Sequence, residues 1–194
     1  MTNLLTLLRR PVARFAREER GTVVAEAVIV LPVLLWAYIA LFAYWDSFRS
    51  INTMQKATYT ISDMISREQD KKGITSGYVD GMKEVMEYLI DEDQDARLRV
   101  SSIYFSDANQ RFEVHWSRSP GNQMIPLTNE TLQLYKSRIP QLSPGEYEVL
   151  VEVQVDYQPK FDVGLPEETF NQFIPTRPRF MPCIAMDNIS CPVS

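Results

Sequence analysis

The side chains that could carry out acid–base, nucleophilic or metal chemistry are few in this chain of 194 residues, which holds one histidine and two cysteines. His115 has no Ser, Cys or Asp at a spacing that marks a catalytic triad, so we expect an ordinary surface histidine. One His and two Cys do not form the usual four-ligand zinc site without carboxylates. The acidic run over residues 91–95 lacks the spacing of a calcium-binding EF-hand loop. We therefore expect no catalytic residue, no metal site and no cofactor, in a protein that is not an enzyme.

The composition excludes two further classes of site. None of the seven glycines falls in a GxxxxGK or GxGxxG pattern, so no phosphate-binding loop is expected. The chain has 20 Lys and Arg against 25 Asp and Glu. This balance argues against a nucleic-acid-binding protein held by phosphate contacts.

Cys183 and Cys191 enclose seven residues near the end of the sequence. A disulfide between them would close a short loop and contribute ~2–3 kcal/mol in the chain-entropy model. Such bonds persist in oxidising compartments outside the cytoplasm. We predict this disulfide, with free or metal-bound thiols as the alternative.

Glu26 is the titratable residue with the most unusual surroundings, because it lies in the apolar run Thr22–Trp45. Only Thr22, Glu26 and Pro32 in these 24 residues fall outside the apolar set. As a helix the run is ~36 Å long, enough to cross a ~30 Å hydrocarbon core. We predict a transmembrane helix over residues 22–45, the alternative being a buried core helix of a soluble domain. A carboxylate in such a helix faces a partner, or else extends to the cytoplasmic headgroups.

The charges on either side of this run predict its orientation. Residues 1–20 hold five arginines and two glutamates, a net charge of +3, and the rest of the chain carries −8. By the positive-inside rule, residues 1–21 form a basic cytoplasmic leader and the remainder lies outside. The apolar run is too long for a typical signal peptide, and no clear small-residue cleavage site follows it. The segment is therefore expected to stay as an anchor.

The string around the start of the apolar run resembles the processing site of type IV prepilins. Gly21 lies at the boundary between basic and apolar residues, and Glu26 follows five positions later. More specifically, residues 14–35 are similar to the start of TadE-like minor pseudopilins of tight-adherence (Flp-type) pilus systems, with Pro32 at the matching distance from the glutamate. The resemblance implies cleavage after Gly21 by a prepilin peptidase. It also implies that Glu26 pairs with the new ammonium at Thr22 of a neighbouring subunit.

Two departures from the family pattern limit this resemblance. The glutamate is preceded by Ala25 rather than by a branched apolar residue, and it is followed by Ala27 rather than by the tyrosine of the major pilin. The second departure, with the length of the chain, argues against the main filament subunit. Pro32 is expected to kink the helix, and a plain kink is as consistent with the sequence as a role in filament packing.

The resemblance implies a membrane-anchored structural and assembly component of a type IV pilus that serves adhesion. Its expected partners are the prepilin peptidase, other pilins and pseudopilins, inner-membrane assembly proteins and the lipid bilayer, but no nucleic acid. It implies a single-pass protein of the bacterial inner membrane with its C-terminal domain periplasmic or extracellular. The alternatives are an uncleaved signal-anchor protein with an extracytoplasmic binding or sensing domain and a membrane-tethered hydrolase.

The periodicity beyond the membrane predicts an α+β head on a helical stalk. Apolar residues recur at helical spacing over residues 46–66, so one helix is expected from 22 to 66, with a linker over 67–77. A second helix over Tyr78–Asp91, capped by Ser76, would bury the stripe of Val79, Met82, Val85, Met86, Leu89 and Ile90.

Alternating residues then predict an antiparallel sheet of about three strands. These strands are Leu98–Phe105, with a phase slip at Ser101-Ser102 that indicates a bulge, Phe112–Trp116 and Tyr147–Tyr157. A turn is expected at residues 107–110 and a short helix at Thr128–Arg138. The head would thus comprise residues 78–158, and the proline-rich segment 159–194 would lie extended over it with little regular structure.

Overall fold

The computed structural model describes residues 20–90 and 95–191, without the side chains of Arg20 and Thr22. Most of the predicted leader and the acidic residues Asp91, Glu92 and Asp93 lie outside this range. The described chain forms two compact units. One holds the residues up to Trp45 together with Lys160–Leu165, and the other, the head, holds the rest.

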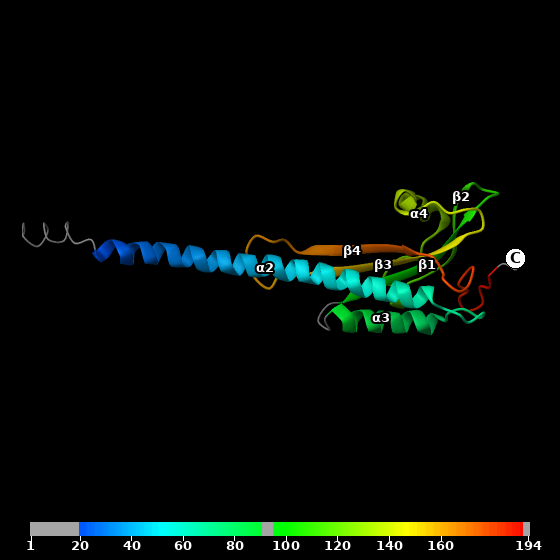
Figure 1. The fold of residues 1–194 in the computed structure, drawn as a ribbon, viewed down its shortest axis with the longest axis horizontal. Helices are drawn as coiled ribbons and strands as arrows, with labels where there is room; N and C mark the ends of the chain where they lie inside the picture. Colours follow the sequence, from blue (N-terminus) through cyan, green and yellow to red (C-terminus); the bar gives the residue numbers. More distant parts are fainter. Residues whose placement is uncertain (1–19, 91–94, 192–194) are drawn as a thin grey trace, which may run out of the picture. The chain divides into compact units, whose positions relative to one another are not determined.

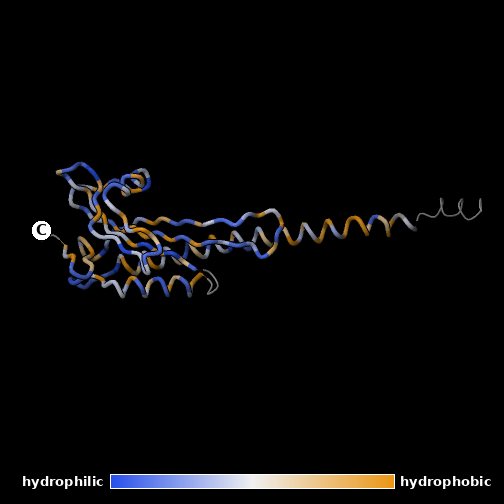
Figure 2. Tube along the Cα trace, turned by 180° about the vertical axis from the view of Figure 1, so that it is seen from behind, coloured by the Kyte–Doolittle hydropathy of each residue, from blue (hydrophilic) through white to orange (hydrophobic). Residues whose placement is uncertain are grey.

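The first element is a single helix, α2 (Arg20–Ser66), which confirms the predicted long N-terminal helix. No glycine or proline interrupts it beyond Pro32. Its first half is mostly apolar, as the orange stretches along the helix in Figure 2 show. Its second half is amphipathic, and within the head it buries a stripe at helical spacing. That stripe consists of Met54, Ala57, Thr58, Ile61, Ser62 and Ile65.

A second helix, α3 (Ser76–Ile90), follows a short connection. Its N-cap is Thr75 rather than the expected Ser76, because the Thr75 hydroxyl accepts the hydrogen bond from the Tyr78 amide at 3.1 Å. Val79, Met82, Met86 and Ile90 are buried as predicted and Val85 is partly buried. Leu89 lies at the margin of the stripe and is 38% exposed.

The head contains a four-stranded antiparallel sheet in the order β2-β1-β3-β4 (Figure 1). Its strands are β1 (Ala96–Ser106), β2 (Arg111–Arg118), β3 (Tyr147–Tyr157) and β4 (Glu168–Thr176). Strands β1 and β2 are joined by the expected turn at residues 107–110. The α+β class is therefore confirmed, with four strands rather than about three.

The extra strand, β4, lies in the proline-rich segment that was expected to lack regular structure. It pairs with β3 from Val149↔Thr176 to Tyr157↔Glu168, and it contains Pro175. Proline disrupts a central strand. An edge strand such as β4 has a neighbour on one side only and therefore tolerates proline. The prediction failed because the local pattern of β4 does not define a strand by itself. The strand forms through its pairing with β3.

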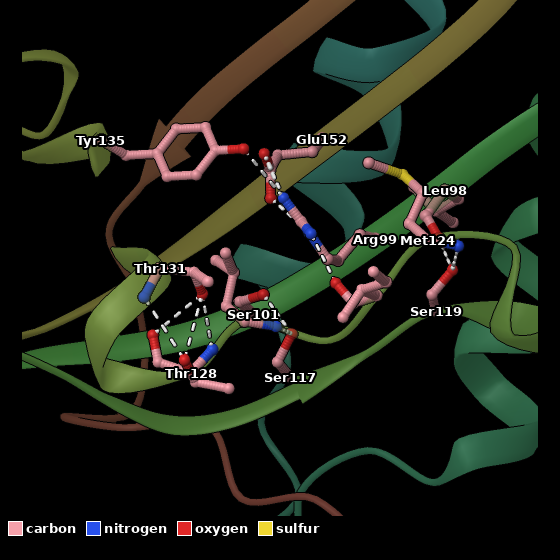
Figure 3. Close-up of polar contacts among 12 residues, drawn as sticks. Leu98, Arg99, Ser101, Ser117, Ser119, Met124, Thr128, Thr131, Tyr135 and Glu152 are labelled. Atoms are coloured by element: carbon pink, nitrogen blue, oxygen red, sulfur yellow. Dashed lines mark hydrogen bonds and ion pairs between the residues drawn. The ribbon is translucent and has the colours of Figure 1, made fainter. Parts of the chain in front are cut away.

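Both faces of the sheet are covered. On one face, α2 and α3 form the larger hydrophobic core with Leu98, Val100, Val151 and Val153. On the other, the short elements α4 (Asn129–Leu132) and η2 (Gln133–Arg138) accompany a smaller core around Ile103, Leu132 and Leu150. The turn η1 (Pro120–Asn122) follows β2 and contacts α3 and β1. The helix predicted at Thr128–Arg138 is thus α4 followed by η2, and a reciprocal capping box between Thr128 and Thr131 fixes its start (Figure 3).

Candidate functional site

The feature of this molecule with the clearest functional meaning is the first half of α2. All its large apolar side chains except the partly buried Ile39 are between 40% and 71% exposed, far more contiguous apolar surface than a water-soluble protein leaves open. By length and composition α2 could cross a membrane. The exposed residues are Val23, Val24, Val28, Ile29, Val30, Leu31, Val33, Leu34, Leu35, Trp36, Tyr38, Leu41, Phe42, Tyr44 and Trp45.

Glu26 is an exposed carboxylate near the start of this apolar surface. Within the part of the chain that the structure describes, no ion pair or side-chain hydrogen bond involves Glu26. An ionised carboxylate near the centre of a membrane helix costs ~2.5–3.5 kcal/mol, and less towards the interface. In a bilayer, this side chain is therefore stabilised by headgroups and water or by a group of another chain.

Gly21 and Thr22, the predicted processing site, lie in the first turn of α2. Gly21 is exposed, and a Cβ atom placed on it would meet no atom within 4 Å. Nothing in the described chain therefore covers the backbone at this point. Pro32 lies inside the same helix and has no N–H to donate to the carbonyl of Val28, which leaves one helical hydrogen bond unmade.

The two cysteines form a disulfide, Cys183–Cys191, and its loop joins three parts of the head. The indole Nε1 of Trp116 on β2 donates to the carbonyl of Ile184 at 2.7 Å. The carboxylate of Asp187 accepts from the amide of Ser76 at 3.1 Å, at the start of α3. A Cβ atom on Gly73, whose φ is +74°, would collide with the carbonyl of Ala185, so only glycine fits beneath this loop.

His115 takes part in this junction and is not the simple surface residue that alternation predicted. The sheet register shifts between Ser102 and Ile103, so that Ser102 faces Trp116 and Ile103 faces Val114, and His115 is the extra residue of a bulge. Its Nε2 lies 3.2 Å from the carbonyl of Ser190 and therefore carries the hydrogen. Burial lowers the pKa of His115, and the hydrogen bond to Ser190 only partly offsets this effect. The bulge predicted at Ser101-Ser102 is therefore absent from β1, which pairs with β3 without a shift, and the inserted residue belongs to β2.

The opposite face of the sheet carries a buried ion pair between Arg99 and Glu152 (Figure 3). Arg99 donates to both carboxylate oxygens, at 2.6 and 2.8 Å, to the carbonyl of Ile125 and to the hydroxyl of Tyr135. Burial alone would lower the pKa of Arg99, but the hydrogen bond and charge of Glu152 raise it overall. Through these hydrogen bonds, Arg99 holds η2 and the segment around Ile125 against β1 and β3.

Glu148 is a second buried carboxylate of β3. It lies at a position where the alternation of the strand predicts a polar face. It is 2% exposed, and its Oε2 has no hydrogen-bond partner. Burial raises the pKa of Glu148 to about 7, although the nearby Arg177 lowers it in part. The alternation of β3 was correct, but a strand pattern does not reveal that its polar face is covered by a separate segment.

None of these clusters resembles a catalytic or metal-binding arrangement. Across residues 20–90 and 95–191 there is no group of three or more His, Cys, Asp and Glu side chains that could hold a metal ion. His115 faces a carbonyl and a disulfide sulfur, 3.9 Å from its Nδ1, and neither is a nucleophile that it could activate.

In the apolar half of α2, the exposed Gly21 lies about 1.4 turns from Glu26, a carboxylate without an ion-pair partner among the described residues. Comparisons with protein-family models, with curated proteins and with solved structures gave no match to this chain.

Proposed function

We propose that this protein is a minor pseudopilin of a tight-adherence type IV pilus, a membrane-anchored structural and assembly component with no enzymatic activity. The observation that carries the proposal is the division of α2. Its first half holds Gly21 and Glu26 on an exposed apolar surface, while its second half packs on the sheet of the head. A subunit that is stored in a membrane and then packs its helix against other helices needs this division.

The geometry at Gly21 supports processing by a prepilin peptidase. The residue lies at the start of α2 without a covering side chain, and the apolar run begins immediately after it. Cleavage after Gly21 would remove the basic leader and leave an ammonium at Thr22. The anchor itself would stay in the bilayer because it lies entirely on the other side of the cut.

The isolation of Glu26 supports a partner on another chain. Its carboxylate is exposed within an apolar surface, so a neighbouring helix that brings a cation there relieves the cost of burying the charge. The ammonium at Thr22 of an adjacent processed subunit is the cation that we propose. Other pilins, pseudopilins and inner-membrane assembly proteins are the partners that this mode of packing implies.

The disulfide and the arginine balance support the proposed location. We place residues 1–21 in the cytoplasm, α2 in the bacterial inner membrane and the head in the periplasm or beyond. The Cys183–Cys191 bond needs an oxidising compartment on the side of the head.

The deciding experiment is the intact mass of the protein extracted from membranes after co-expression with the cognate prepilin peptidase. We expect a chain that begins at Thr22, and a Gly21→Leu variant that keeps its leader. Gly81→Ala is the matched control, because Gly81 also lies in a helix with open space around its Cβ position. A wild-type chain that begins at Met1 in the presence of active peptidase would contradict the proposal and favour the uncleaved signal-anchor alternative.

A further inference from the structure

The connection between β3 and β4 contains a short apolar segment. This segment belongs to the same compact unit as the first half of α2, and not to the head. Residues 160–165 read Lys-Phe-Asp-Val-Gly-Leu. They cluster with the part of the chain up to Trp45. The ring of Phe161 lies edge-on to the ring of Phe42, with 6.1 Å between the centroids. This segment, the 160–165 loop, therefore contacts α2 inside its apolar half.

The 160–165 loop is unusual for a connection facing water. Three of its six residues, Phe161, Val163 and Leu165, are apolar. Phe161 remains 45% exposed even with Phe42 against it, so the contact with the helix does not bury the ring. Gly164 has a φ of +91°, a conformation that only glycine adopts readily, and it sharpens the turn between the two aliphatic residues.

The position of Phe42 along the helix gives the depth of this contact. Nineteen residues separate Val23, where the apolar run starts, from Phe42. At ~1.5 Å per residue this is ~29 Å, close to the ~30 Å thickness of the hydrocarbon core. Phe42 therefore lies where hydrocarbon gives way to headgroups. Tyr44 and Trp45 follow it, and aromatic rings of this kind are enriched at that level.

We infer that the 160–165 loop is a second membrane contact, which inserts Phe161 and Val163 into the interfacial layer of the phospholipid bilayer beside Phe42. This inference rests on the proposed anchoring of α2 in a membrane. Lys160 and Asp162 are exposed and alternate with the apolar residues, so their charges stay among the headgroups while the apolar side chains reach inward. The head is then held at the membrane by two chain segments instead of one.

The test uses the full-length protein in nanodiscs of phosphatidylethanolamine and phosphatidylglycerol. A Val163→Cys variant is labelled with an environment-sensitive fluorophore; the native cysteines are bonded to each other and do not react. We expect a blue-shifted emission that loses intensity when the lipid acyl chains carry bromine near the headgroup. Adding Phe161→Asp to the labelled variant should reverse both changes.

Two labelled controls separate this inference from the proposed anchoring. Leu41→Cys, in the exposed apolar half of α2, should be quenched by the brominated lipid, and Ala108→Cys, in the exposed β1–β2 turn, should not. Quenching at Leu41 without quenching at Val163 overturns the loop contact and leaves the anchor standing. Loss of quenching at both overturns the anchor and the loop contact together. If neither lipid bromine nor aqueous iodide quenches the label at Val163, a protein partner covers the loop. This result would overturn the lipid contact.

Discussion

The two halves of α2 are equally helical, yet the half that is richer in apolar residues is the exposed one. In the first half, Ile29 is 69% exposed and Glu26 has no partner among the described residues. In the second half, Ile61 is fully buried, and within the head the charged pair of Arg99 and Glu152 is buried as well. The comparison teaches that apolar content alone does not define a core. The first half needs a surrounding lipid or protein phase, whereas the second half has its own sheet.

The largest effect on the stability of the head is expected from Arg99→Ala. This change leaves the carboxylate of Glu152 buried without its cation and should lower the free energy of unfolding by ~3–5 kcal/mol. Thermal or denaturant unfolding of the detergent-solubilised protein, followed by near-ultraviolet circular dichroism, measures it. The double variant Arg99→Met with Glu152→Leu removes both charges and should lose clearly less. An equal loss in both variants would mean that shape, and not the unpaired charge, determines the cost.

A matched pair of truncations tests the division of α2 directly. Ile61→Ala should destabilise the head by ~2–5 kcal/mol, because it opens a cavity in a packed core. Ile29→Ala removes the same atoms from an exposed position and should change the unfolding of the head by less than ~0.5 kcal/mol. The same unfolding measurement applies to both. Equal losses would show that the first half of α2 also contributes to the stability of the head.

The pH dependence of stability tests how completely the head excludes water from Glu148. Its pKa is raised from an ordinary value near 4.5 to about 7 in the folded protein, so the folded state binds the proton more tightly than the unfolded state. The stabilisation is fully present below pH 4.5 and is lost as the pH rises to about 7, by about 3 kcal/mol at most. Glu148→Gln keeps a neutral side chain and should not show this loss. Parallel pH profiles of the two proteins would mean that Glu148 is solvated.

The smallest effect on the head is expected from Glu26→Ala. Among the described residues, no ion pair or side-chain hydrogen bond joins Glu26 to the head. Membrane insertion and unfolding should therefore stay unchanged, while the proposed pairing predicts that pilus assembly in cells falls sharply. Val30→Ala, one turn further along the same apolar surface, is the control and should assemble normally. Unimpaired assembly with Glu26→Ala would remove the proposed pairing between subunits.

Local patterns predicted most of the elements in this fold. Helix α2 follows from an uninterrupted apolar and then amphipathic run, and strands β1, β2 and β3 follow from alternation. These signals succeed because each depends on residues that are neighbours in the sequence. The register irregularity lies opposite the predicted change of phase, but the bulged strand is β2 and not β1.

Long-range partners account for what the sequence did not reveal. The edge strand β4 forms by pairing with β3. Its Pro175 leads a prediction from local sequence to expect no strand. Glu148 and Glu152 alternate with apolar residues along β3, and this alternation does not reveal that both are buried in the folded head. The N-cap of α3 is Thr75 rather than Ser76, and the long-range hydrogen bond from the Ser76 amide to Asp187 could not be foreseen from the local sequence. For the candidate site, the sequence supplied Gly21, Glu26 and Pro32 but gave no sign of the 160–165 loop.

The disulfide loop also has a consequence for the order in which the protein folds. Asp187 bonds to the start of α3 across 111 positions, and the amide of Arg179 bonds to the carbonyl of Ser66 at the end of α2. Strand β4 also comes from this late part of the chain. A ribosome releases α2 and α3 long before these partners exist, so the head stays incomplete until residues 168–191 have been synthesised. Folding that depends on such distant contacts is slow. The buried faces of the two helices therefore stay open until the last strand and the disulfide loop have joined them.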